Sequence, residues 1–144
     1  TGSTSYNYGE IVPQIGYGPL TLKYYITYTP DYAGYNSDTM GGTEGKRSRG
    51  TTYLDLTFTQ PINESWTFGA HYGYERIKNF SEANFQDMKV ELIKDLGDGW
   101  TTGLAYAKAW DKNGFYKKYS NGEPDAPISN PVDSTFTVSV KKVF

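Results

Sequence analysis

Residues 20–28 read LTLKYYITY, and this stretch decides the expected fold. Its even positions, from Leu20 to Tyr28, are aliphatic or aromatic, whereas its odd positions include Thr21, Lys23 and Thr27. Successive side chains of a β-strand point to opposite faces of the sheet, so the two sets lie on opposite faces. The stretch therefore predicts a strand with one apolar and one polar face.

The same alternation recurs along the chain and predicts seven strands. They are expected at about residues 9–17, 20–28, 52–60, 66–75, 86–96, 100–110 and 134–144. Pro13 cannot donate to a β-ladder, which places the first strand at a sheet edge or at a bulge. The segment 86–96 also tolerates a helical spacing, but its β-branched Val90 and Ile93 favour a strand.

The connections between these strands alternate between short and long. The short ones are 18–19, 61–65 and 97–99, and the long ones are 29–51, 76–85 and 111–133. Outer-membrane barrels have short turns on the periplasmic side and long loops outside. The alternating strands and uneven connections together predict an antiparallel transmembrane β-barrel in the bacterial outer membrane, whose chain ends on the periplasmic side.

The composition agrees with a barrel wall. Hydrophobic residues make up 37% of the chain, aromatic residues 17%, and the mean hydropathy is −0.64. A barrel wall needs apolar residues only at alternate positions. No apolar run approaches the ~18 residues of a membrane helix. The net charge of −2, without a basic stripe, argues against nucleic-acid binding, and the absence of Cys excludes disulfides and thiolate metal sites.

Alternation assigns individual side chains to the two faces of the wall and to its rims. The residues expected to face lipid are Leu20, Leu22, Leu54, Leu56, Tyr72, Leu104, Val138 and Val140. Those expected to line the lumen are Lys23, Asp55, His71, Glu75, Lys89, Glu91 and Lys141. Aromatic girdles at the membrane–water boundaries would contain Tyr17, Trp66, Trp100, Trp110 and Phe144. Lys94, Lys108 and Lys142 fall near strand ends on the lipid face, where long side chains reach the headgroups.

Seven strands cannot close an all-antiparallel barrel, because the first and last would run the same way. A strand could be overlooked, the first and last could pair in parallel, or an N-terminal portion could be missing. The opening Thr1-Gly2-Ser3 reads as the end of an outer loop and favours the third explanation, with ten or twelve strands in total. Another chain could instead cover the open edges, since an unpaired edge is not viable in lipid.

Several segments carry a resemblance to a known family. They are YGEIVPQIGYGPLTLKYYITYTPDYAG (8–34), WTFGAHYGYE (66–75), DMKVELIKDLGDGWTTGLAYA (87–107) and STFTVSVKKVF (134–144). They resemble the C-terminal part of the TorF-type porins of proteobacteria, over nearly the whole chain. The resemblance implies a small outer-membrane barrel with roughly double this strand content, and it supplies no catalytic residues to carry over. The final strand ends in Phe144, like the strands that the barrel assembly machinery reads.

An enzymatic function and a cofactor are not expected. His71 is the only histidine, and alternation directs it to the lumen, whereas an outer-membrane lipid hydrolase needs its His and Ser on the lipid-facing surface. A hydrogen-bonded lumen residue is the expected role. Lumen charges of both signs fit either a path for solutes or an ion-pair network that fills the barrel. The basic segment with Lys46, Arg47 and Arg49 could meet anionic lipopolysaccharide or remain a solvated loop.

Three functions stay open at this point. The first is a porin or channel for small polar solutes, in contact with outer-membrane lipid and lipopolysaccharide. The second is a closed structural barrel whose long loops, 29–51 and 111–133, bind a partner. The third is a soluble ligand-binding β-barrel or sandwich, in which residues such as Leu22, Leu56 and Val138 form an inner core.

Overall fold

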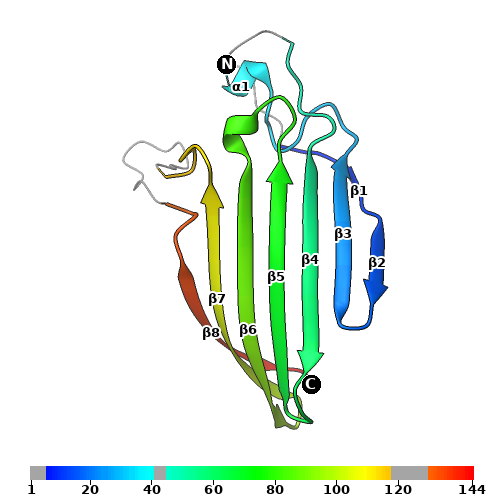
Figure 1. Ribbon diagram of the computed structural model, residues 1–144, viewed down its shortest axis with the longest axis vertical. Helices are drawn as coiled ribbons and strands as arrows, with labels where there is room; N and C mark the ends of the chain where they lie inside the picture. The colour runs from blue at the N-terminus through cyan, green and yellow to red at the C-terminus, as the bar shows by residue number, and fades with distance from the viewer. Residues whose placement is uncertain (1–5, 41–44, 118–129) are drawn as a thin grey trace.

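The computed structural model describes residues 6–40, 45–117 and 130–144, and its described part is all-β. One antiparallel sheet contains eight strands (Figure 1). The strands are β1 (Glu10–Ile11), β2 (Gln14–Tyr17), β3 (Leu20–Thr27), β4 (Thr52–Pro61), β5 (Trp66–Arg76), β6 (Phe85–Gly97), β7 (Trp100–Asp111) and β8 (Thr135–Lys142). Two short helices, α1 (Ser37–Met40) and η1 (Ser81–Ala83), lie in the connections. None of the helices among the described residues has the length and apolar character that a membrane span requires.

The strands follow one another across the sheet in the order β1-β3-β4-β5-β6-β7-β8, and β2 also pairs with β3. The expected strand 9–17 is therefore split into β1 and β2, which both pair with β3 at the sheet edge. The break falls at Val12 and Pro13, where proline has no N–H to donate. The Pro13 carbonyl still accepts a hydrogen bond from the Tyr24 N–H at 3.0 Å. The edge position predicted for Pro13 is confirmed.

The segment 86–96 is a strand, so the helical alternative is wrong. β6 pairs without interruption with β5 and pairs with β7 up to a bulge between Asp95 and Gly97. The turn that follows has positive φ at Gly97 (83°), Asp98 (49°) and Gly99 (76°). Glycine adopts this region without steric cost, which suits the sequence Gly-Asp-Gly to a tight hairpin.

The short and long connections lie at opposite ends of the sheet (Figure 1). The turns after β2, β4 and β6 form one end, and the chain terminus joins it, since the Val143 N–H donates to the Gly99 carbonyl at 2.9 Å. The longer connections, with α1 and η1, form the other end. Residues 41–44 and 118–129, which belong to two long connections, lie outside the described residues.

The register separates the side chains into an apolar face and a polar face. Leu22, Leu56, Tyr72 and Met88 succeed one another across β3 to β6. One residue further along β4, the row on the opposite face runs through Thr57, His71 and Lys89. We call these two surfaces the apolar face and the polar face.

The apolar face is exposed, and the small buried core lies elsewhere. Leu104 is 54% exposed and Val138 77%. Among the described residues, the buried hydrophobic side chains are Ile77, Phe80 and Ala83, which lie in the connection between β5 and β6. The described part of the chain has no second layer of structure against the apolar face, which a sandwich core would require.

The sheet is curved but open. In Figure 1, β8 runs obliquely behind β7 and β6. Its outer edge and the edge formed by β1 and β2 have no strand partner among the described residues. Counting β1 and β2 as one interrupted edge strand gives an odd number of positions across the sheet, as the strand prediction anticipated. The antiparallel all-β prediction is confirmed.

Candidate functional site on the polar face

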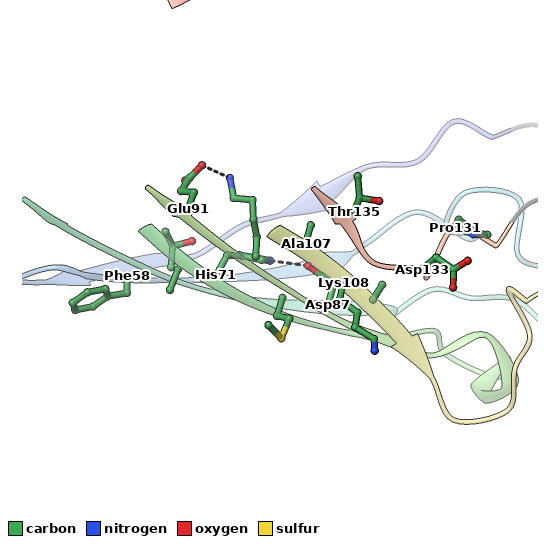
Figure 2. A pocket seen from close by; sticks show the side chains of 14 residues that line it. Phe58, His71, Asp87, Glu91, Ala107, Lys108, Pro131, Asp133 and Thr135 are labelled. Atoms are coloured by element: carbon green, nitrogen blue, oxygen red, sulfur yellow. Dashed lines mark hydrogen bonds and ion pairs between the residues drawn. The ribbon is translucent and has the colours of Figure 1, made fainter. Parts of the chain in front are cut away.

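His71 is the centre of a hydrogen-bonded cluster that joins three neighbouring strands. Its Nε2 lies 2.9 Å from Oδ1 of Asp87 on β6 (Figure 2), and its Nδ1 lies 3.1 Å from Oδ1 of Asp55 on β4. The Tyr53 hydroxyl donates to Oδ2 of Asp87 at 2.9 Å and lies 3.1 Å from Nε2. Thr57 donates to Oδ1 of Asp55 at 2.8 Å. We call these five residues the His71 cluster.

The geometry of this cluster favours a cross-strand clamp. An ionised carboxylate only accepts hydrogen bonds, so an imidazole between two carboxylates donates to both of them when both of its nitrogens carry a proton. The carboxylates of Asp55 and Asp87 contact opposite sides of the ring. The three side chains therefore do not converge on one point, and no metal-binding group of His, Asp or Glu occurs among the described residues.

Gly73 makes room for the cluster. It lies between Asp55 and Asp87 in the register of β4, β5 and β6. A methyl group at this position would overlap the Tyr53 hydroxyl and the Asp87 carboxylate. The missing side chain on β5 thus lets residues of β4 and β6 meet across it.

Two of the cavities on the polar face lie beside Gly103, Ala105 and Ala107 of β7. One of them, of about 440 Å³, is lined by members of the His71 cluster, by Lys89 and by Ala107 (Figure 2). The second, of about 310 Å³, is lined by Glu91, Ala105 and Lys141. Lys89 and Glu91 form an ion pair of 3.0 Å between the two cavities. The small side chains of Ala105 and Ala107 and the absence of one at Gly103 leave this space on the polar face.

All of the residues predicted to line a lumen lie on the polar face, but the structure brings together only some of them. Asp55 and His71 meet in the cluster, and Lys89 meets Glu91. Glu75 is apart from them, 2% exposed, at the end of β5 nearest the long connections. The sequence interpretation missed Tyr53, although strict alternation from Asp55 places it on the polar face.

The residues predicted to face lipid all lie on the apolar face by register. At its short-turn end, Lys94 Nζ lies 5.2 Å from the Trp66 ring centroid. Lys142 Nζ likewise lies 5.1 Å from the Trp100 ring and 5.8 Å from the Phe144 ring. These are cation–π distances.

The aromatic residues at the strand ends are staggered. Trp110 lies at the opposite end of β7 from Trp100. Tyr17, 86% exposed, ends the shorter β2–β3 hairpin and is level with Ala70, four residues along β5 from Trp66. A flat girdle through Tyr17 and Trp66 would require strands tilted to the membrane normal, as barrel strands are.

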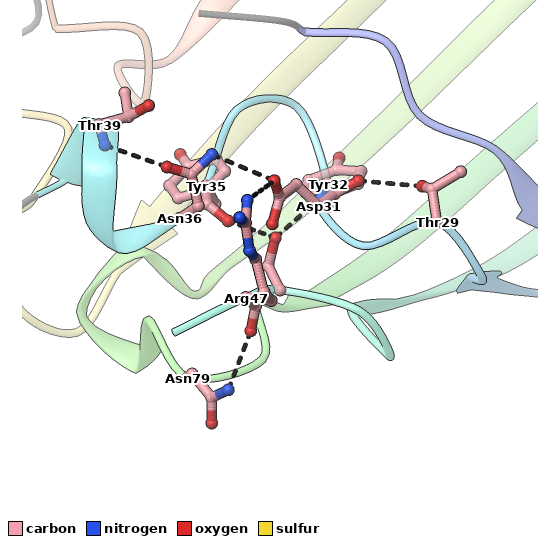
Figure 3. A network of polar contacts seen from close by, with 9 residues as sticks. Thr29, Asp31, Tyr32, Tyr35, Asn36, Thr39, Arg47 and Asn79 are labelled. Carbon is pink, nitrogen blue, oxygen red and sulfur yellow. Dashed lines mark hydrogen bonds and ion pairs between the residues drawn. The ribbon is translucent and has the colours of Figure 1, made fainter. Parts of the chain in front are cut away.

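The long connections are tied together by polar contacts (Figure 3). Asp31 Oδ2 accepts from Arg47 at 2.8 Å and from Asn36 Nδ2 at 3.2 Å. Asn79 Nδ2, from the next connection, donates to the Arg47 carbonyl at 2.9 Å. Arg47 therefore braces its own loop, while Lys46 and Arg49 of the predicted basic segment are exposed.

Tyr116 joins the third long connection to the other two. Its hydroxyl donates to the Ala83 carbonyl at 2.7 Å and lies 3.0 Å from the Tyr35 hydroxyl. Burial, reinforced by the hydrogen bond with Tyr35, raises the pKa of the Tyr116 phenol above its ordinary value. Residues from all three long connections thus pack around the buried Ile77, Phe80 and Ala83.

Comparison with known proteins gives one match. A family described as "Bacterial protein of unknown function (Gcw_chp)" matches the chain over residues 1–144. No curated protein and no solved structure matches it.

Proposed function

We propose that this chain, which belongs to the Gcw_chp family of bacterial proteins, forms part of an outer-membrane β-barrel that passes small polar solutes. One observation carries the proposal: a single sheet exposes an apolar face on one side and holds a connected set of charged residues on the other. In a barrel, the first face meets lipid and the second lines the lumen.

Water is a poor environment for the apolar face. Phe136, Val138 and Val140 on β8 are 74%, 77% and 66% exposed, and Leu104 on β7 continues the same surface. Soluble monomers rarely expose large contiguous apolar patches. Acyl chains would solvate this surface, and the antiparallel ladders already satisfy most backbone polar groups, as lipid requires.

The strand lengths also suit a bilayer. β4, β5, β6 and β7 contain 10, 11, 13 and 12 residues, and a tilted transmembrane strand needs about 9–11. We expect the long connections outside the cell and the Phe144 end in the periplasm. Lys94 and Lys142, beside their aromatic rings, would then lie at headgroup level.

The barrel must close through strands that the described sheet does not contain. The edge of β1 and β2 and the edge of β8 would pair either with further strands of this protein or with another chain. An even total of ten or twelve strands would satisfy antiparallel closure. The TorF-type porins remain the family whose architecture we propose for the closed form.

Conduction of solutes is supported by the cavities between the charged residues of the polar face. The cavities beside His71 and Lys141 occupy about 440 and 310 Å³. Their walls combine Lys89 and Lys141 with Asp87 and Glu91. Small side chains of β7 keep these spaces open, as a path for small polar solutes would require.

A structural barrel that docks a partner through its loops is the second candidate. It is favoured by the long connections, which are built around Ile77 and Phe80 and braced by Asp31 and Arg47. Loops held in this way present a defined surface. Removing 29–51 and 111–133 distinguishes the two functions, because a channel would still conduct and a docking protein would lose its partner.

Reconstitution into planar bilayers tests the channel. We expect stepwise conductance, and a Lys89→Glu variant should shift the reversal potential toward cation selectivity because its charge lies on the conducting path. A matched Lys78→Glu change, on an exposed connection residue, should shift it less. Absence of conductance from the intact protein would overturn the proposal.

A further inference from the structure

We propose that a pocket at the long-connection end of the polar face binds a small organic ammonium ion. The pocket has a volume of about 260 Å³. Its wall combines two carboxylates with aromatic rings, and these residues come from five strands and from two segments outside them. The residues that matter to the argument are Glu10, Glu75, Tyr25, Tyr32, Tyr53 and Phe85.

Glu75 supplies the first reason to expect a cation. Its side chain is 2% exposed, and its Oε1 has no hydrogen-bond partner within the described residues. The register of β3 to β6 places it in a row between aromatic neighbours, in the order Tyr25, Tyr53, Glu75, Phe85. A buried carboxylate oxygen without a partner is unfavourable, and contact with a positive charge stabilises it.

The acidic side chains that line the pocket are those of Glu10 and Glu75. Glu10 on β1 lines the pocket together with Glu75, and Asp87 on β6 is paired with Gly73, two residues along β5 from Glu75. No lysine or arginine of the described residues lines the pocket. Arg47, from the neighbouring connection, is already paired with Asp31 at 2.8 Å. A cationic ligand would supply this missing positive charge.

The aromatic rings indicate what kind of cation fits. The Tyr25 and Tyr53 rings are 5.8 Å apart at 61°, and the Tyr53 and Phe85 rings 6.5 Å apart at 38°. On the loop side, the Tyr8 and Tyr32 rings are 4.6 Å apart at 65°. Rings at such angles present both faces and edges to one small volume. Aromatic cages of this kind attract ammonium groups through the ring quadrupole.

An organic cation fits better than a metal ion. Metal ions such as calcium and magnesium need several oxygen ligands around one point, and the described acidic residues form no such group. Aromatic walls bind the alkyl groups of an organic ammonium, while Glu75 and Glu10 neutralise its charge. The small volume suits a ligand of a few carbon atoms.

The inference goes beyond the proposed channel and does not depend on conduction. The pocket lies at the end of the polar face where the long connections meet. In a conducting barrel it would concentrate organic cations at the entrance. In a closed barrel it would be a surface receptor site for the same ligands. Loss of ammonium binding therefore does not imply loss of conductance, or the reverse, and each property can be measured without the other.

The test compares choline with its neutral isostere 3,3-dimethyl-1-butanol. Isothermal titration calorimetry on the unmodified protein in detergent micelles should detect choline binding, with the neutral alcohol about tenfold weaker or worse, as expected for loss of a contact to a charged group. Equal affinities, or no choline binding at millimolar concentration, would overturn the inference. This comparison needs no variant, so it does not depend on how a substitution affects folding.

Variants then locate the site. Glu75→Gln should weaken choline binding by about tenfold or more because it removes the buried charge. Glu64→Gln, an exposed carboxylate in the turn at the opposite end, should leave binding unchanged. Tyr25→Phe should retain choline binding, whereas Tyr25→Leu should lower the affinity for choline several-fold, because only phenylalanine keeps an aromatic ring. Unchanged choline affinity in Glu75→Gln would refute the site.

Discussion

The Nε2 atom of His71 lies 2.9 Å from Oδ1 of Asp87, while its Nδ1 lies 3.1 Å from Oδ1 of Asp55. The two carboxylates belong to the strands on either side of the histidine. The imidazole ring of His71 therefore links three strands on the polar face. In a soluble sheet, contacts within a hydrophobic core would link the strands instead.

Replacing His71 with alanine should destabilise the protein by about 2 kcal/mol, since Asp55 and Asp87 each lose their contact with the imidazole ring. Urea unfolding in lipid vesicles, followed by tryptophan fluorescence, measures this change. The same substitution in a variant that already carries Asp55→Asn and Asp87→Asn should lower the stability much less, because that variant has no carboxylate charges to leave without the imidazole. Equal losses in both backgrounds would contradict the clamp.

Gly73→Ala should disturb the same cluster from the strand between its members. The added methyl group would overlap the Tyr53 hydroxyl and the Asp87 carboxylate, and overpacking of this kind costs about 1–3 kcal/mol. Gly16→Ala is the matched control, because its nearest neighbour would be the Leu20 carbonyl at 3.7 Å, an ordinary contact. Similar urea midpoints for the two variants would show that Gly73 is not required for packing.

Spin labels test the orientation of the two faces. Nitroxides at Leu22, Leu56, Tyr72, Leu104 and Val138 should be relaxed by dissolved oxygen and shielded from aqueous nickel if lipid covers the apolar face. Labels at Lys23, Thr57 and Lys89, on the polar face, should show the opposite accessibility. Electron paramagnetic resonance power saturation gives both values. Nickel access to the first set would exclude the transmembrane orientation.

Arg47→Gln should loosen the long connections without unfolding the sheet. Arg47 is about half exposed, with 52% of its side chain accessible, and exposed ion pairs contribute little to global stability. The expected effect is faster amide hydrogen exchange at 31–36 and 46–51, with the rates in β4 and β5 unchanged. Arg49→Gln, on an exposed side chain of the same connection, should leave all of these rates as they are.

High pH should loosen the same region. Burial raises the pKa of the Tyr116 and Tyr32 phenols, so the folded protein retains protons that the unfolded chain releases above the ordinary value of about 10. The stabilisation is complete below that value and is lost as the pH rises through and above it. Tyrosinate absorbance should show a delayed fraction, and Tyr116→Phe should make that fraction smaller. A delayed fraction of the same size in the two proteins would argue against burial of Tyr116.

The alternation of apolar and polar side chains, with a period of two residues, predicted much of this structure from the sequence alone. The pattern of Leu20 to Thr27 predicted its strand and its faces, because alternation is a local property of the extended backbone. Pro13 located the edge for an equally local reason, its missing N–H. The positions of the short turns followed from glycine, proline and asparagine at the strand ends.

Which residues of one face meet one another depends on how the strands pair in three dimensions. Cross-strand register brings Tyr53 to Asp87 over Gly73, and it encloses Glu75 among aromatic rings from other strands. Alternation along one strand carries no information about register between strands, because register depends on pairing and connection geometry. The packing of the long connections around Ile77 and Phe80 could not be predicted from the sequence either, because these contacts join residues far apart in the sequence.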